Sequence, residues 1–361
     1  MSKFWETSSR IMSRKISIYP DFSIFEGSYA SQKPQVVYTS LVADLETPVS
    51  AMLKIGSHSK YSFLLESVEG GSVRGRYSII GMEPDIIWRC YDNSPEINRN
   101  AISDTEKFTA ELGGSLHSLR ELLRESEIVL PTNLPPMAAG LVGYMGYDTI
   151  RLVEAIPDNN SQALELPDGL FIRPTLMAIF DTVQDTVIVV TPARPTEQLD
   201  AQAAYKCAVE RLKSVSKDFT RDLPLRRDTS EMETHAVRPS SNVTREDYYD
   251  TVQRAKEYIA AGDIFQVVLS QRFSVPFSLP PFALYRALRR LNPSPFLFYL
   301  NFRNFSIVGS SPEILVRLRD NTVTIRPIAG TRMRGLSMAE DQILAKDLLD
   351  DPKERAEHLM L

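Results

Sequence analysis

The sequence contains little cysteine, histidine and tryptophan, and no long apolar run. Its 361 residues include 2 Cys, 4 His and 2 Trp. Cys90 and Cys207 stand far apart without a Cys-X-X-Cys spacing, which argues against a disulfide scaffold and against a cysteine-based zinc site. No window approaches the ~18 apolar residues of a membrane span, and residues 1–20 lack the apolar run of a signal peptide. These absences predict a protein of a reducing compartment, the cytoplasm, with no membrane partner.

Net charge is also small. Lys and Arg total 41 and Asp and Glu total 46, a formal charge of −5, which is too mild and too mixed in sign to predict binding to nucleic acid. Apolar residues (43%) and charged residues (24%) are close to ordinary globular usage, so the chain is expected to fold. At a prior of ~150 residues per domain, its length predicts about two domains or one large α/β unit.

The amino-terminal half alternates strand-like and helix-like segments. Thr47-Pro48, between the first two strands, is typical of a helix cap followed by proline and predicts a βαβ-like opening. The polar neighbourhood of Gln184 and Asp185 indicates a hairpin turn. We expect strands at 35–43, 61–66, 76–81, 86–91, 175–182 and 186–191, helices at 116–128 and 201–217, and a glycine-punctuated apolar run at 138–147.

Helix caps are clearer in the carboxyl-terminal half. Thr244 with Asp247 predicts the start of a helix that Gly262 ends, and Ser337 with Glu340 predicts another start. Asp351-Pro352 opens the last helix. We further expect a helix at 281–291 and strands at 264–273, 296–300, 307–309, 314–317 and 323–328.

A polar stretch without periodic apolar positions separates the two halves. We predict a frayed start at 1–34, an amino-terminal region at 35–216, a linker at 217–243 and a second domain that begins at 244 and reaches 361. The basic residues among serines in 1–20 leave a transit peptide open as the alternative to a frayed start. The last helix reaches Leu361 without a stop signal, which predicts a sequence truncated at its carboxyl end.

Two features of the second half could carry chemistry. The loop Ala329-Gly330-Thr331-Arg332 follows a predicted strand, and its amides, hydroxyl and guanidinium suit a carboxylate or another small anion, or the loop is a turn that merely needs glycine. Glu354 and Glu357 share one face of the last helix, where they could meet a hard divalent cation or simply face solvent. Residue chemistry alone leaves both alternatives open.

Ordered motifs then identify a family. GDIFQVVLSQRF (262–273), NPSPFLFYL (292–300), GSSPEILVR (309–317), RPIAGTRMRG (326–335) and KERAEHLML (353–361) resemble the motifs of the chorismate-utilising enzymes. LLES (64–67), RYSIIG (76–81) and GYMGYD (143–148) look like the amino-terminal region of anthranilate synthase component I. The resemblance implies an α/β fold of the α+β type, with mixed sheets and surrounding helices, incomplete at the carboxyl end.

The resemblance also implies an activity. Chorismate and ammonia would give anthranilate and pyruvate, the first committed step of tryptophan biosynthesis, with the ammonia supplied from glutamine by an amidotransferase subunit in a hetero-oligomer. Glu357 matches the family's Mg²⁺-binding glutamate, and Glu354 would be its outer partner. Gly330 and Thr331 match the chorismate-binding Gly-Thr pair, and Thr331 could also guide ammonia.

Two positions distinguish the branches of the family. Members that add water to chorismate carry a lysine base where this chain has Gln266, and ammonia needs no such base. Aminodeoxychorismate synthases commonly carry a nucleophilic lysine where this chain has Ala329. Gln266 and Ala329 therefore favour anthranilate synthase, with aminodeoxychorismate synthase component I as the alternative enzyme.

A regulatory site is implied as well. In tryptophan-inhibited relatives, the LLES and NPSP segments bind the end product. Ser67 would bond its polar groups, and Glu66 or Arg76 would add charge near the zwitterion. The indole pocket would be lined by Pro295, Phe296 and Leu297.

The resemblance places the family's catalytic histidine and second Mg²⁺ glutamate after the position of Leu361. We therefore expect the chain alone to be inactive. A non-catalytic tryptophan-binding module is the alternative from a different functional class.

Overall fold

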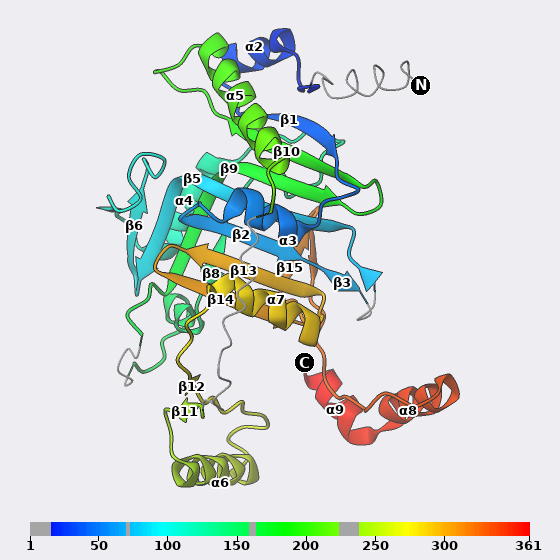
Figure 1. Ribbon diagram of the computed structural model, residues 1–361. Helices are drawn as coiled ribbons and strands as arrows, with labels where there is room; N and C mark the ends of the chain where they lie inside the picture. The colour runs from blue at the N-terminus through cyan, green and yellow to red at the C-terminus, as the bar shows by residue number, and fades with distance from the viewer. Residues whose placement is uncertain (1–15, 70–72, 159–163, 224–237) are drawn as a thin grey trace. The chain divides into compact units, whose positions relative to one another are not determined.

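The computed structural model describes residues 16–69, 73–158, 164–223 and 238–361 (Figure 1). The chain divides into two compact units, Met1–Pro224 with Leu284–Leu361, and Leu225–Ala283. Most of the predicted linker at 217–243 lies outside the described residues, as do residues 1–15 of the predicted frayed start and transit segment. The remainder of that start contains helix α2 (Phe22–Ala30), which buries Phe25 and Tyr29.

The first unit is built on one sheet of ten strands. Every neighbouring pair is antiparallel, and the central path runs β1-β10-β9-β5-β2-β13-β14. Off this path, β6 pairs with β5, β7 with β6, and β8 with β9. The strands are β1 (Gln35–Val42), β2 (Tyr61–Glu66), β5 (Tyr77–Tyr91), β6 (Ser94–Asn98), β7 (Thr109–Ala110), β8 (Val142–Met145), β9 (Gly169–Asp181), β10 (Thr186–Ala193), β13 (Phe296–Phe302) and β14 (Phe305–Ser311). The predicted fold class, with helices around sheets, is confirmed, but the described strand pairs are all antiparallel rather than mixed.

The sheet corrects two strand predictions. The strands expected at 76–81 and 86–91 are one strand, β5, which continues through a bulge between Pro84 and Ile86. Pro84 lies opposite Pro174 of β9, so neither residue needs to donate a ladder hydrogen bond at this point. The βαβ-like opening is also modified: β1 and β2 run in the same direction, but three antiparallel strands separate them. The predicted hairpin of β9 and β10 is confirmed.

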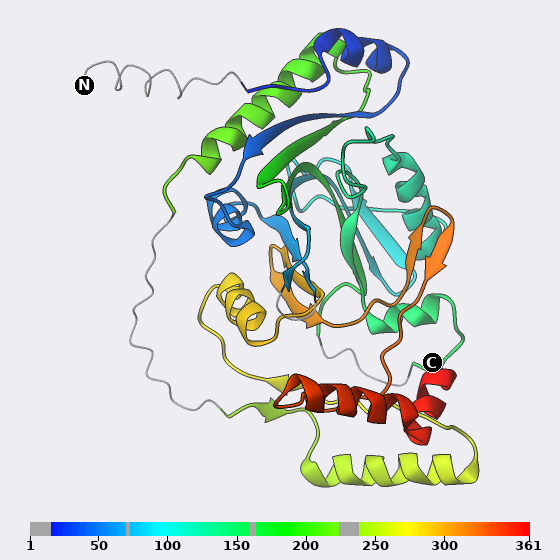
Figure 2. The same cartoon turned by 90° about the vertical axis from the view of Figure 1, so that its right-hand side faces the viewer.

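Helices cover the sheet and complete its core. Helix α5 (Ala201–Phe219) lies along β10 and β1 and buries Ala208, Leu212 and Phe219 (Figure 2). Helix α4 (Ser115–Ser126) packs Leu119 and Leu122 beside Trp88, whose indole N–H donates to Ser118 Oγ at 2.7 Å. The other helical segments of the first unit are α3 (Pro48–Ala51), the π-helical turn η1 (Met52–Gly56), the 3₁₀ turn η2 (Tyr147–Leu152), α8 (Met338–Asp350), α9 (Pro352–Met360) and most of α7 (Pro281–Leu291).

Three short strand pairs complete the strands. They are β3 (Val68–Glu69) with β4 (Val73–Arg74), β15 (Arg317–Arg319) with β16 (Thr322–Thr324), and β11 (Ser240–Ser241) with β12 (Phe273–Ser274). The strands predicted at 314–317 and 323–328 are therefore shorter and shifted. Among the described residues β15 and β16 pair with each other and with no third strand, and such a two-stranded pair is short.

The second unit is described by itself. Helix α6 (Arg245–Ala261) begins at Thr244, whose hydroxyl accepts from the Asp247 amide, and ends at Gly262 with φ of 81°, as predicted. The strand predicted at 264–273 is wrong. Of this segment only Phe273 pairs with another strand among the described residues, as the first residue of β12. The apolar residues of this segment led us to expect a buried strand. In the described part of the chain they are exposed, with Phe265 and Val268 80% and 86% exposed.

No helix in the described part of the chain is both long and apolar enough to cross a membrane.

Candidate functional site

The loop around Gly330 lies directly against helix α9. A Cβ atom at Gly330 would overlap Glu354 Oε2, so any other residue here would displace the Glu354 side chain. Asp351 begins α9 and its carboxylate accepts from the amides of Lys353 and Glu354 at 2.9 and 3.3 Å. The helix start therefore fixes the turn from which Glu354 meets the loop.

Arg332 links this loop to the end of α8 and the start of α9. Its guanidinium donates to Asp347 at 2.9 Å, to Asp351 at 2.7 Å and to Glu354 at 3.3 Å. The hydrogen bond from Arg332 to Asp347, with those to Glu354 and Asp351, raises the pKa of the Arg332 guanidinium. One cation thus binds three carboxylates from two helices and holds Glu354 beside Gly330.

A cavity of about 670 Å³ opens beside these residues. Glu354, Arg355 and His358 supply its polar side chains, Ala329 and Gly330 contribute the loop, and its apolar side includes Leu348 and Leu359. Thr331 is exposed, and its carbonyl accepts from Arg332 at 3.2 Å. The structure thus brings Gly330 and Glu354 together at one cavity edge, with Thr331 next to Gly330 in the chain but outside the lining, and this edge could take a small molecule bearing a carboxylate.

Glu357 lies one turn after Glu354 on α9 and is half-buried. Its carboxylate has no hydrogen bond or ion pair among the described residues, whereas that of Glu354 is shared with Arg332. Carboxylate oxygens suit Mg²⁺, which commonly binds one or two protein carboxylates and completes its shell with water and substrate oxygens. Glu357 as a direct ligand, with Glu354 one turn earlier on α9 as its neighbour, fits such a partial ligand set. No cluster of three or more metal-binding side chains was found in the described ranges.

Gln266 belongs to the second unit. It is exposed on the extended segment that follows α6, and its side chain makes no hydrogen bond among the described residues. An amide at this position neither takes nor supplies a proton near neutral pH.

The predicted regulatory residues gather where β2 pairs with β13. Leu297 lies opposite Glu66, and Phe296 and Pro295 precede it along the chain. Leu297 is buried and Phe296 is 40% exposed. Ser67 follows β2, and its carbonyl accepts from the Gly75 amide at 2.7 Å.

The two charged residues predicted beside this pocket already have partners. The Arg76 guanidinium donates to Asp181, with Nη2 2.8 Å from Oδ2. The Glu66 carboxylate accepts from Arg289 at 2.8 and 2.9 Å and from the Tyr285 hydroxyl. Sequence reasoning missed Arg289, Tyr285 and Asp181. A carboxylate that directly follows the apolar residues of β2 does indicate a buried cation, but not which one.

Comparisons with known proteins show the family of the chain. Residues 83–361 match the model of the chorismate binding enzyme family. The chain is 52% identical over 340 residues to anthranilate synthase component 1 of Cereibacter sphaeroides, covering 94% of this chain and 68% of that protein. It is 40% identical over 358 residues to the Synechocystis protein of the same name, covering 95% of this chain and 70% of that protein. The chain thus spans about two thirds of the length of these relatives.

Solved structures show the same relationship. The crystal structure of anthranilate synthase component I from Streptococcus pneumoniae matches with a TM-score of 0.64 and 28% identity, over 80% of this chain and 60% of that one. The menaquinone-specific isochorismate synthase MenF of Escherichia coli, at 14% identity, is similar in fold alone, with a TM-score of 0.54 over 99% of this chain and 66% of that one. The resemblance to anthranilate synthase component I is confirmed, and the chain belongs to the chorismate-binding enzyme family.

Proposed function

We propose that this chain is the larger part of an anthranilate synthase large subunit, which converts chorismate and ammonia into anthranilate, pyruvate and water. The observation that carries the proposal is the contact of Gly330 with Glu354, because it joins the predicted substrate loop to the predicted metal-binding helix. Since the chain spans about two thirds of its relatives' length, the activity is proposed for the full-length protein. The 361-residue chain alone is expected to be inactive.

The loop and helix would share the work of binding chorismate. The amide of Gly330 and the hydroxyl of Thr331 can donate to a substrate carboxylate, and the missing Cβ of Gly330 allows close approach. Glu357 would hold Mg²⁺, and Glu354 would assist through water. When bound, the ion would neutralise the ring carboxylate of chorismate and orient it.

The residues that differ between branches support ammonia as the nucleophile. Ammonia would add at ring C2 as the C4 hydroxyl leaves, and loss of the C2 proton with pyruvate would then form the aromatic ring. Neutral ammonia is a stronger nucleophile than water and needs no base to activate it, so Gln266 in place of a base is sufficient. Ala329 cannot form a covalent link to the ring, which favours direct amination. A glutamine amidotransferase subunit would supply the ammonia in a cytoplasmic hetero-oligomer.

Feedback inhibition by tryptophan is the regulatory part of the proposal. Ser67 would bind the polar end of the amino acid, and Pro295, Phe296 and Leu297 would contact its indole. β2 and β13 bring these segments together although they are far apart in sequence. Because Arg76 pairs with Asp181 and Glu66 with Arg289, we expect these charges to orient the pocket walls, or to contact ligand only after exchanging partners.

The test is a product analysis. The full-length protein is incubated with chorismate, Mg²⁺ and ammonium, and anthranilate is followed by its fluorescence and identified by chromatography. Anthranilate supports the proposal, whereas para-aminobenzoate would instead indicate aminodeoxychorismate synthase component I. Calorimetry with tryptophan on the 361-residue chain and on its Ser67→Ala variant tests the regulatory site. Tryptophan binding together with an inactive full-length protein would leave the non-catalytic module as the better interpretation.

A further inference from the structure

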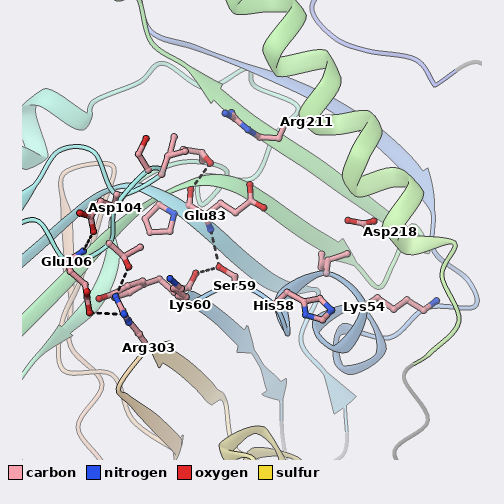
Figure 3. A pocket seen from close by; sticks show the side chains of 18 of the residues that line it. Lys54, His58, Ser59, Lys60, Glu83, Asp104, Glu106, Arg211, Asp218 and Arg303 are labelled. Carbon is pink, nitrogen blue, oxygen red and sulfur yellow. Dashed lines mark hydrogen bonds and ion pairs between the residues drawn. The ribbon is translucent and has the colours of Figure 1, made fainter.

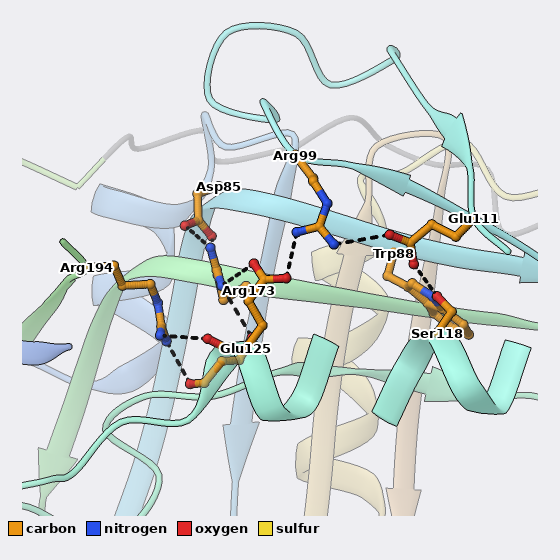
Figure 4. Close-up of polar contacts among 9 residues, drawn as sticks. Asp85, Trp88, Arg99, Glu111, Ser118, Glu125, Arg173 and Arg194 are labelled. Atoms are coloured by element: carbon orange, nitrogen blue, oxygen red, sulfur yellow. Dashed lines mark hydrogen bonds and ion pairs between the residues drawn. The ribbon is translucent and has the colours of Figure 1, made fainter. Parts of the chain in front are cut away.

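A cavity of about 220 Å³ lies between α5 and the strands β9 and β10, and the loop at 329–332 forms no part of it. Three arginines, Arg173, Arg194 and Arg211, line this cavity, and Asp85 is the one carboxylate among its described lining residues. Figure 4 shows Arg173, Arg194 and Asp85 near the end of α4. The balance of charge at the cavity depends on how these four side chains are paired.

Both carboxylate oxygens of Asp85 accept hydrogen bonds from Arg173. Arg173 donates from Nε to Oδ1 at 2.9 Å and from Nη2 to Oδ2 at 2.7 Å, a two-point ion pair (Figure 4). Glu125 approaches Arg173 at 3.4 Å but also accepts from Arg99 at 2.6 Å. The nearby carboxylates are therefore already shared among Arg173 and Arg99.

Arg194 donates hydrogen bonds only to neutral groups in the described part of the chain, and no ion pair at contact distance involves it there. Its guanidinium donates to the main-chain carbonyl of Ser126 at 2.8 Å and to those of Glu125 and Glu127 at 3.3 and 3.4 Å, which caps the end of α4. Burial, with a further contribution from the charge of Arg173, lowers the pKa of Arg194 to about 10, although the charges of Asp85 and Glu125 act in the opposite direction. An anion hydrogen-bonded to Arg194 would offset part of this cost of burying its charge.

Arg211 is the second cation without a carboxylate. It reaches from α5 and donates to Thr191 Oγ1 at 2.7 Å, and no ion pair involves it within the described ranges. It also lines a neighbouring cavity of about 560 Å³ (Figure 3). Several cations of that cavity are paired, among them Arg303 with Glu106 at 2.7 Å. Arg211 thus remains able to receive an anion.

The rest of the 220 Å³ cavity is mainly apolar. Ala204 and Ala208 of α5 are 9% and 3% exposed, and their spacing places them on the same helix face as Arg211. Ala193 and Leu199 extend this apolar lining. We propose that the cavity binds a small apolar monocarboxylate, with its carboxylate at Arg194 and Arg211 and its hydrocarbon part against Ala204 and Ala208.

Titration calorimetry of the 361-residue chain tests the proposal with cyclohexanecarboxylate as the probe and cyclohexanecarboxamide as its neutral counterpart. We expect the carboxylate to bind and the amide to bind at least tenfold more weakly. Arg211→Leu should weaken carboxylate binding at least tenfold. Lys213→Leu removes an exposed cation from the same helix and should change the affinity for the carboxylate less than twofold. Thr331→Ala should leave this affinity unchanged, which distinguishes binding in this cavity from binding at the loop at 329–332.

Three results would overturn the proposal: no binding to the unaltered chain, equal binding of acid and amide, or equal affinity of the Arg211→Leu variant. If Arg211→Leu does not fold, the same calorimetry is carried out on Ala204→Val, which fills part of the cavity without removing a charge. That variant should weaken binding at least threefold, and unchanged affinity would reject the cavity as the site.

Discussion

Glu66 of β2 and Arg289 of α7 form a buried ion pair between residues separated by 223 positions in the sequence. Arg289 Nη2 lies 2.8 Å from Glu66 Oε1, and the side chains of Arg289 and Glu66 are 19% and 5% exposed. The Tyr285 hydroxyl also donates to this carboxylate. Because β2 ends within LLES and α7 leads directly into NPSP, the pair connects the two predicted regulatory segments.

Removing the arginine should destabilise the chain strongly. Arg289→Leu leaves the Glu66 carboxylate buried without its cation, which typically costs about 3–5 kcal/mol. The measurement is the free energy of unfolding in urea. Arg290→Leu is the matched control, because Arg290 is exposed and its side chain has no hydrogen-bond or ion-pair partner in the described ranges. Equal stability of the two variants would contradict a structural role for the pair.

Neutralising the remaining partner should restore stability. In the Arg289→Leu background, Glu66→Gln removes the uncompensated charge but keeps an acceptor for the Tyr285 hydroxyl. We expect the double variant to recover about half of the lost free energy of unfolding. A double variant that is less stable than Arg289→Leu would show that charge burial is not the cause of the loss.

Local features of the fold were predictable and distant pairings were not. The caps at Thr244 and Ser337 involve residues three positions away, so the sequence pattern contains all of their chemistry. The partners of Glu66 lie more than 200 residues away, and many arginines were equally eligible. The same holds for Arg332, whose three carboxylates become neighbours only when α8, α9 and the loop meet.

Apolar composition was an incomplete guide to strands for a related reason. The run at 264–273 has the residues of a strand, but a strand also needs a partner that satisfies its backbone. Conversely, the polar Glu83-Pro84-Asp85 segment is typical of a break, yet β5 passes through it because the bulge and Pro174 remove the need for ladder hydrogen bonds. The order of the motifs in the sequence was enough to predict that the loop at 329–332 binds substrate. Its contact with Glu354 could be seen only in the folded chain.

Asp181 should make stability depend on acid pH. Burial alone would raise the pKa of Asp181, but hydrogen bonds from Arg76 and from the amides of Val183 and Gln184 outweigh it and hold the pKa below its ordinary 3.8. The folded state therefore prefers the ionised carboxylate. Its contribution is fully present well above pH 3.8 and is lost as the pH falls through the lower, folded-state pKa.

The measurement is the urea midpoint from about pH 6 downward, a range that begins about two units above the ordinary pKa. Asp181→Asn should be less stable than the unaltered chain at the upper end of this range, and this difference should shrink as the pH falls. Asp44→Asn changes an exposed carboxylate and serves as the control. A difference that does not depend on pH would mean that ionisation of Asp181 is not involved.

Gly330→Ala should impair activity without unfolding the chain. The new Cβ would overlap Glu354 Oε2, and a flexible side chain can move away at little cost in stability. The displaced carboxylate would lose its place beside Arg332 and the substrate loop. We expect kcat/KM of the full-length protein to fall at least tenfold, about 1.4 kcal/mol, with little change in the urea midpoint. Gly27→Ala is the control, because nothing lies within 4 Å of its added Cβ.

Glu357 and Glu354 should differ in their effect on the Mg²⁺ requirement, although both lie on the same helix face. The Glu357 carboxylate has no partner among the described residues and can bind the ion directly, whereas Arg332 holds Glu354 at 3.3 Å and competes with the ion for its oxygens. Glu357→Gln should therefore raise the Mg²⁺ concentration for half-maximal activity of the full-length protein at least tenfold, and Glu354→Gln by a smaller factor. Excess Mg²⁺ should restore part of the activity in both. If the two variants require the same Mg²⁺ concentration as the unaltered protein, neither carboxylate binds the ion and the metal site must be sought elsewhere.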